Sequence, residues 1–233
     1  MEINYKHWLH RLNGVSQELM AARSLSELLS TILTETRRLT DSDAGSIYRV
    51  NRDEDPPKLI FEEAQNDTVE ISNDAVTLPL DRSSLAGYAA LEGEVLNIDD
   101  VYQIGADRPY TFDREVDESL GYRTKSMLVL PLENREGTIR GVLQLINRKA
   151  DPELSIEETK ILSYPDELLE VVEPFSYQAA VALERAELDE SIQSMIDSII
   201  QSLVNAMDKR DKITTGHSRR VAGYGYHLAQ AIN

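Results

Sequence analysis

Ten polar side chains interrupt apolar segments of the chain or lie in the polar stretch between them, where they could hold an organic ligand by hydrogen bonds. They are Ser46, Tyr48, Asp99, Asp100, Tyr102, Arg108, Tyr110, Arg123, Ser126 and Gln144. Arg108 and Arg123 could bind a phosphate or carboxylate through paired hydrogen bonds. In so acidic a chain, ion pairs with neighbouring acids such as Asp107 and Asp113 are the favoured interpretation of these arginines.

Other chemistries lack the residues that they need. The chain has no cysteine, which excludes disulfides, thiolate metal sites, cysteine nucleophiles and thioether-linked chromophores. Its histidines, His7, His10, His217 and His227, leave residues 16–188 without one, which disfavours haem and non-haem iron there. Residues 16–188 have no Gly-rich phosphate loop and no serine with a nearby histidine. We therefore expect no catalytic residue and no cofactor in this chain.

Hydrophobic periodicity predicts the elements that would position these side chains. In chain order they are a helix within 16–40, strands at 46–50 and 59–61, a helix at 84–91, strands at 94–98, 126–132 and 139–147, and a helix from 166 past 206. Pro174 should kink or interrupt the last helix.

The segments 126–132 and 139–147 are predicted to be adjacent central strands. Alternation places Ser126 on the face of Leu128 and Leu130, and Gln144 on the face of Val142, without deciding which face holds a ligand. The expected fold class is α+β, with a central antiparallel sheet flanked by helices and a long C-terminal helix of coiled-coil type.

That C-terminal helix carries an apolar stripe, first on a seven-residue a/d grid and then at spacings of four. Its members are Val181, Leu188, Ile192, Met195, Ile199, Leu203 and Met207. A heptad stripe with one register shift is typical of a two-chain coiled coil with a stutter. The alternative is packing onto the chain's own domain, but the stripe extends about four turns beyond the strand-rich segment. We therefore predict a parallel homodimer.

Charge is unevenly distributed along the chain. The net charge is −17, with −18 in residues 1–189 and +1 in residues 190–233. This acidity disfavours binding to nucleic acid and to anionic membranes. The N-terminus lacks the apolar core of a secretion signal, and no segment approaches the roughly 20 apolar residues of a membrane span. We expect a soluble cytoplasmic protein with a domain junction near residue 190.

Three strings together resemble a GAF domain, the small-molecule-sensing module of signalling proteins. They are SLAGYAALEGEVLNIDDVY, GYRTKSMLVLPLENREGTIRGVLQLINRK and QAAVALERAEL, at 84–102, 121–149 and 178–188. The resemblance covers residues 16–188, with 1–15 as an N-terminal extension and 189–208 as a signalling helix. It implies a central antiparallel sheet with the terminal helices on one face and a ligand pocket under loops and short helices on the other.

Residues 204–233 resemble the opening helices of an HD-GYP phosphodiesterase domain. The matching residues are Arg210, Asp211, Thr214, Gly216, His217, Arg220 and Val221. The resemblance implies that, in a full-length parent, His217 would bind an iron or manganese cluster that hydrolyses cyclic di-GMP. The HD doublet, the later histidines and the GYP triplet are missing. Residues 209–233 are therefore interpreted as the incomplete start of that domain, with an exposed His217 and no diesterase activity in this chain.

These observations leave competing functions. The first is a regulatory small-molecule-sensing GAF module of a bacterial-type signalling protein. The full-length form of that protein would be a metal-dependent cyclic di-GMP phosphodiesterase, and it would dimerise through the C-terminal helix. The second is a ligand-free dimerisation scaffold, and a metal-dependent hydrolase is disfavoured by the missing motifs. A cyclic nucleotide is allowed because Asn147-Arg148-Lys149 and Asp151 match part of the signature of cyclic-nucleotide-binding GAF domains. The signature's Phe is absent, however, so a charged turn explains these residues equally well.

Overall fold

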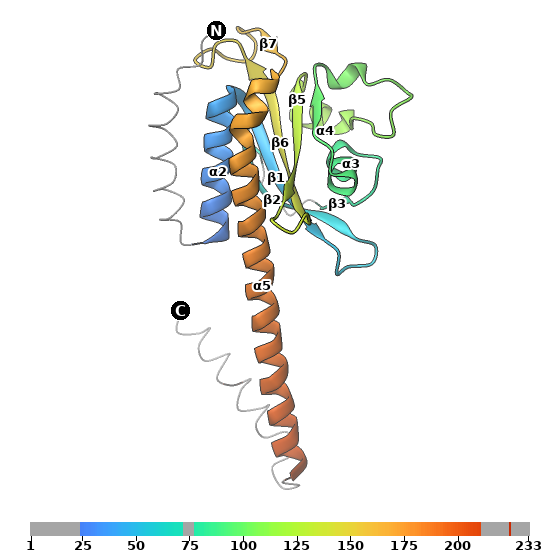
Figure 1. Cartoon of the computed structure of the whole chain (residues 1–233), viewed down its shortest axis with the longest axis vertical. Helices are drawn as coiled ribbons and strands as arrows, with labels where there is room; N and C mark the ends of the chain where they lie inside the picture. The colour runs from blue at the N-terminus through green and yellow to red at the C-terminus, as the bar shows by residue number, and fades with distance from the viewer. Residues whose placement is uncertain (1–23, 72–76, 211–223, 225–233) are drawn as a thin grey trace. The chain divides into compact units, whose positions relative to one another are not determined.

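The computed structural model describes residues 24–71, 77–210 and 224, and its main element is an antiparallel sheet (Figure 1). Within the described residues the strand order is β3-β2-β1-β6-β5-β4, and β7 pairs with β6. The strands are β1 (Ser42–Asn51), β2 (Lys58–Asn66), β3 (Thr77–Pro79), β4 (Leu96–Ile98), β5 (Met127–Glu133), β6 (Ile139–Lys149) and β7 (Ile161–Leu162). The predicted α+β class is confirmed. The predicted pairing of segments 126–132 and 139–147 is also confirmed, as β5 and β6.

Two helices cover one face of the sheet with apolar side chains. The first is α2 (Leu25–Thr40), which begins after Ser24, whose hydroxyl accepts a hydrogen bond from the Glu27 N–H. The second is the part of α5 (Asp166–Arg210) up to Arg185. The buried core of this layer includes Leu29, Ile32, Leu33, Leu128, Leu143, Leu145, Val172, Phe175 and Leu183.

Gly141 of β6 lets α5 approach the sheet closely. A Cβ atom at this position would lie 2.3 Å from the Tyr48 carbonyl oxygen and 2.7 Å from the Leu183 side chain. Any larger residue would therefore push the strand and the helix apart.

The opposite face of the sheet is covered by short elements and the loops between them. These are α3 (Leu85–Glu92), the 3₁₀ turn η1 (Val101–Gln103) and α4 (Arg114–Leu120). A second buried cluster fills the space under them, formed by Leu85, Ala86, Ala89, Val101, Tyr110, Met127, Val129 and Val142 among others. The loops and short elements between β3 and β5 thus cover one face of the sheet.

The helix α5 runs for 45 residues and is not interrupted at Pro174. The chain divides into two units, 1–185 and 186–233, and α5 contributes to both. In its predicted seam, Val181, Leu188, Ile192, Met195, Ile199 and Leu203 are all exposed, whereas the side chain of Met207 lies outside the described residues. None of the described helices is both long enough and apolar enough to cross a membrane.

Candidate ligand-binding site

A buried polar pair sits in the apolar layer beneath α3. Ser46 of β1 and Gln144 of β6 are directly paired across the two strands. The Ser46 hydroxyl donates a 3.2 Å hydrogen bond to Gln144 Oε1, and both residues are more than nine-tenths buried. Burying polar groups in an apolar layer costs free energy unless they are hydrogen-bonded, and these two side chains bond to each other. The pair is therefore a polar feature on an otherwise apolar face of the sheet.

Aromatic side chains belong to the apolar cluster on the same face of the sheet. Tyr48 lies two residues after Ser46 on the same face, with its ring centroid 5.5 Å from that of Phe61. Burial raises the pKa of Tyr48 above its usual value of 10, although the nearby Ser46 hydroxyl partly opposes this. Tyr110 is buried in the same cluster, and its ring centroid lies 4.9 Å from that of Tyr88. The site therefore offers aromatic faces and a protonated phenol.

Tyr102 lies at one edge of the site, and two arginine guanidinium groups lie over its ring. The guanidinium carbon of Arg123 lies 3.5 Å from the Tyr102 ring centroid, and that of Arg114 lies 4.8 Å away. These are cation–π contacts. Asp100 positions the ring because its carboxylate accepts a hydrogen bond from the Tyr102 backbone N–H. Within the described residues the ion pair expected for Arg123 is absent, and the aromatic ring takes the place of an acid.

The remaining predicted site residues lie apart from the polar pair. Asp99 and Arg108 are exposed, and no ion pair of Arg108 occurs among the residues that the structure describes. Ser126 is buried, but alternation from Leu128 directs it toward the layer of α2 and α5, where its hydroxyl accepts from the Arg148 N–H. Tyr48, Tyr102 and Tyr110 thus belong to one apolar cluster on this face of the sheet, Ser46 and Gln144 are paired on its strands, and Arg123 contacts Tyr102.

A buried carboxylate that the sequence did not single out organises the end of the sheet. Asp43 is 1% exposed, and its Oδ2 accepts hydrogen bonds from the hydroxyls of Tyr122 (2.8 Å) and Thr68 (2.9 Å). Lys149 Nζ lies 3.7 Å from Asp43 Oδ1, and Asn147 Nδ2 donates to the Tyr122 hydroxyl. The only sequence signal for this cluster was the partial Asn147-to-Lys149 match, because its members come from distant segments.

The structure gives no support for metal chemistry in the part of the chain that it describes. No group of three or more His, Cys, Asp or Glu in that part could hold a metal ion. His217, the residue assigned to a metal site by resemblance, lies outside the described residues. The residues at hand therefore do not fit a metal cluster, and no reaction step is derived through one.

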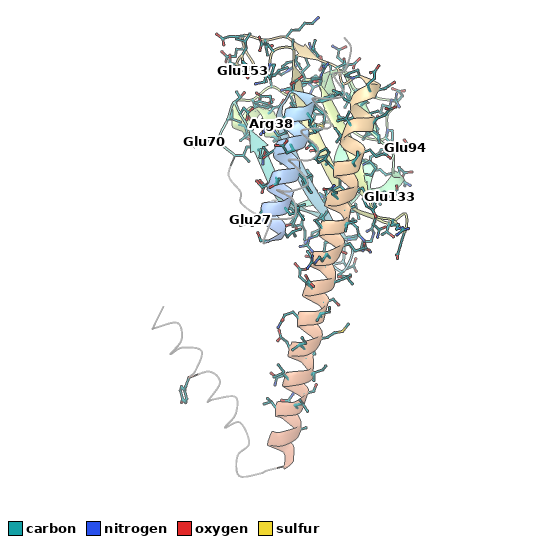
Figure 2. The ribbon with its side chains drawn as sticks, turned by 60° about the vertical axis from the view of Figure 1, so that its left-hand side comes forward. Glu27, Arg38, Glu70, Glu94, Glu133 and Glu153 are labelled. Carbon is teal, nitrogen blue, oxygen red and sulfur yellow. The ribbon has the colours of Figure 1, made fainter. Side chains whose placement is uncertain are left out.

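Acidic side chains are widely distributed over the surface. Figure 2 shows Glu27, Glu70, Glu94, Glu133 and Glu153 on separate elements and loops, and all five are exposed. Such exposed carboxylates are solvated and contribute to the acidity of the protein.

Comparison with known proteins gives a family and two curated relatives. The family model described as "GAF domain" matches residues 24–183. A dual 3',5'-cyclic-AMP and -GMP phosphodiesterase 11A from Takifugu rubripes is 30% identical over 186 residues, which are 78% of this chain and 18% of that protein. A dual phosphodiesterase 11 from Drosophila melanogaster is 32% identical over 146 residues, or 58% and 10% of the two chains. The chain therefore spans less than a fifth of either relative.

Solved structures share the fold at low identity. A GAF domain of a phosphoenolpyruvate-protein phosphotransferase from Coxiella burnetii has a TM-score of 0.61 at 17% identity, covering 81% of this chain and 99% of its own. The corresponding domain from Acinetobacter has a TM-score of 0.59 at 16% identity, covering 82% and 99%. The comparisons give no evidence of an HD-GYP domain.

Proposed function

Because the chain belongs to the GAF family, we propose that it is a regulatory module that binds a small organic ligand between its sheet and α3. The observation that carries this proposal is the buried Ser46–Gln144 pair in an otherwise apolar layer. A ligand pocket typically combines apolar walls with a few placed polar groups, and this layer has that composition.

The chemistry of the surrounding residues favours a cyclic purine nucleotide. The Gln144 amide carries both donors and an acceptor, which suits the polar edge of a purine base. Tyr48, Tyr102 and Tyr110 offer rings on which a base could stack. Arg123 could pair with the cyclic phosphate at the edge of the site. The names of the curated relatives, which are cyclic-AMP and cyclic-GMP phosphodiesterases, support this class of ligand.

The strand β6 connects the proposed site to the helix layer. Gln144 faces the site, while its neighbours Leu143 and Leu145 belong to the core that α5 covers. A ligand that shifts β6 would therefore change the surface on which residues 172–183 pack. It can bias the packing of α5 only by the difference in its affinity for the two arrangements.

A second function, a ligand-free dimerisation scaffold, is favoured by the exposed stripe on α5. Leu188, Ile192, Met195 and Ile199 are each more than half exposed, which is costly for a helix in water. A second copy of the chain, with its stripe in parallel, would cover this face. Dimerisation by itself is compatible with both functions, since a sensor can be dimeric; ligand binding distinguishes them.

The output of a longer parent protein is a further part of the proposal. The resemblance of residues 204–233 to an HD-GYP domain supports a metal-dependent cyclic di-GMP phosphodiesterase, with His217 as one metal ligand. The chain itself should show no hydrolysis of cyclic di-GMP in the presence of Mn²⁺. Turnover by the purified chain would contradict the assignment of the activity to a catalytic domain outside this chain.

Titration calorimetry with cyclic AMP, cyclic GMP and cyclic di-GMP tests ligand binding. We expect one of these nucleotides to bind. Gln144→Leu should raise its Kd by at least about tenfold, because a polar edge of the base loses its hydrogen-bond partner. Gln178→Leu is the matched control, since Gln178 is exposed on α5. No heat and no shift in melting temperature with any of the three compounds would favour the scaffold function instead.

A further inference from the structure

The short helix α4 is held in place by one buried side chain. Among residues Arg114–Leu120, Asp117 is buried and the other six are exposed. The Asp117 carboxylate accepts hydrogen bonds from the Thr124 N–H (2.7 Å), the Thr124 hydroxyl (2.7 Å) and the Tyr102 hydroxyl (2.9 Å). Arg114 of α4 adds a cation–π contact and a 3.5 Å hydrogen bond to Tyr102. The attachment of α4 therefore depends on polar contacts, with Asp117 as the buried one, rather than on apolar packing of its own residues.

The same three contacts place residues of the candidate site. Tyr102 belongs to η1, and the Arg123 guanidinium lies over its ring. The centroid of that ring lies 5.5 Å from the ring centroid of Phe112. Thr124 is 3% exposed and leads into β5. Asp117 thus joins three segments that are separate in the sequence: α4, η1 and the start of a central strand.

We infer that Asp117 is a positioning residue that latches α4 beside Tyr102, and that the latch controls ligand exchange at the Tyr102 edge of the site. A segment with little buried apolar surface opens at a low free-energy cost. Hydrogen bonds to an ionised acceptor are stronger than neutral ones, so this carboxylate supplies most of what resists opening. The control of ligand exchange rests on the proposed function, whereas the latch itself does not.

Hydrogen exchange of the full chain without ligand tests the latch. Asp117→Asn keeps the size of the side chain but removes its charge, so the hydrogen bonds from Thr124 and Tyr102 lose the added strength of an ionised acceptor. We expect amides of residues 114–120 and 102–103 to exchange at least about tenfold faster, with β1 and β6 unchanged. Glu118→Gln is the matched control, because Glu118 is the exposed neighbour on the same helix. Equal exchange rates in the two variants would overturn the latch.

Dissociation kinetics of cyclic GMP, or of cyclic AMP if that binds, test the control of ligand exchange. Asp117→Asn should release the nucleotide at least about fivefold faster, Tyr102→Phe should give an intermediate rate, and Glu118→Gln should match the wild type. Unchanged release from Asp117→Asn would overturn this half of the inference. If the wild-type chain binds neither nucleotide, the proposed function and the exchange control fail together, and hydrogen exchange alone decides the latch.

Discussion

At the scale of single residues, Asp43 explains how the end of the sheet tolerates a buried charge. Its carboxylate receives two hydroxyl donors and lies near the Lys149 ammonium, so the cost of desolvation is offset by hydrogen bonds and charge. Its backbone oxygen also accepts a 2.6 Å hydrogen bond from Arg37 of α2. The Asp43 cluster therefore connects the sheet to the helix layer as well as to the segment before β5.

Tyr122 gives this cluster a measurable dependence on pH. Burial, followed by the Asp43 charge and hydrogen bond, raises the pKa of Tyr122 far above 10 in the folded state. The unfolded chain loses this proton near pH 10, so above that pH the folded state binds more protons. The free energy of unfolding should therefore fall as the pH rises above 10.

Tyr122→Phe isolates this contribution. We expect urea unfolding to show a loss of about 1–2 kcal/mol at pH 8, because a buried hydrogen-bonded hydroxyl is removed. The further decline between pH 9.5 and pH 11 should be shallower than in the wild type. Tyr177→Phe serves as the control, because Tyr177 is exposed. A decline as steep in Tyr122→Phe as in the wild type would contradict the role assigned to this hydroxyl.

Residues of the site were only partly predictable from the sequence. Alternation placed Gln144 with Val142, and in the structure Val142 belongs to the cluster that includes the buried residues of α3. Alternation alone could not choose between that face and the face of Ser126, because both are buried. The Asp43 cluster and the Asp117 contacts join segments far apart in the chain, so no local pattern reveals them.

At the scale of elements, the long periodic segments were predicted well, as were α3 and β4, whereas the short strands β3 and β7 were missed. The hairpin of β1 and β2 and the pairing of β5 with β6 follow from alternating apolar residues and turn residues between them. In contrast, β3 and β7 have three and two residues and exist only through their pairing with β2 and β6. Such strands leave no periodic signal.

α5 continues through Pro174, so the predicted interruption does not occur, whereas the alternative of a kink stays a prediction. Proline removes one backbone donor, which leaves the carbonyl of Glu170 without its helical partner. Glu170 is exposed, so water can reach that side of the helix. The buried neighbours Val172 and Phe175 stabilise the turn by packing on the sheet.

The stripe on α5 predicts how the chain associates. Ile192→Glu together with Ile199→Glu places charges in the proposed seam, so we expect analytical ultracentrifugation to show a monomer at micromolar concentration where the wild type is a dimer. The control is Ser194→Glu together with Gln201→Glu, which adds the same charges on another face of the same helix. A wild-type monomer, or dissociation caused equally by both pairs, would contradict the seam.

At the scale of the whole molecule, the net charge differs between the sensor part of the chain and the part that carries most of the proposed dimer seam. The net negative charge lies in residues 1–189, at −18, while residues 190–233, which hold most of the seam, carry a net charge of +1. A neutral segment allows two parallel helices to meet without strong repulsion, whereas the acidic surface opposes non-specific association of the GAF portion. The distribution is consistent with a sensor that contacts its partner through α5.

Native mass spectrometry of the whole chain, with and without cyclic AMP or cyclic GMP, tests the central claim most directly. We predict a dimer that carries one nucleotide per chain, either retained from purification or taken up on addition. A dimer that stays free of bound nucleotide at saturating concentrations of both compounds would contradict cyclic-nucleotide sensing and leave the scaffold.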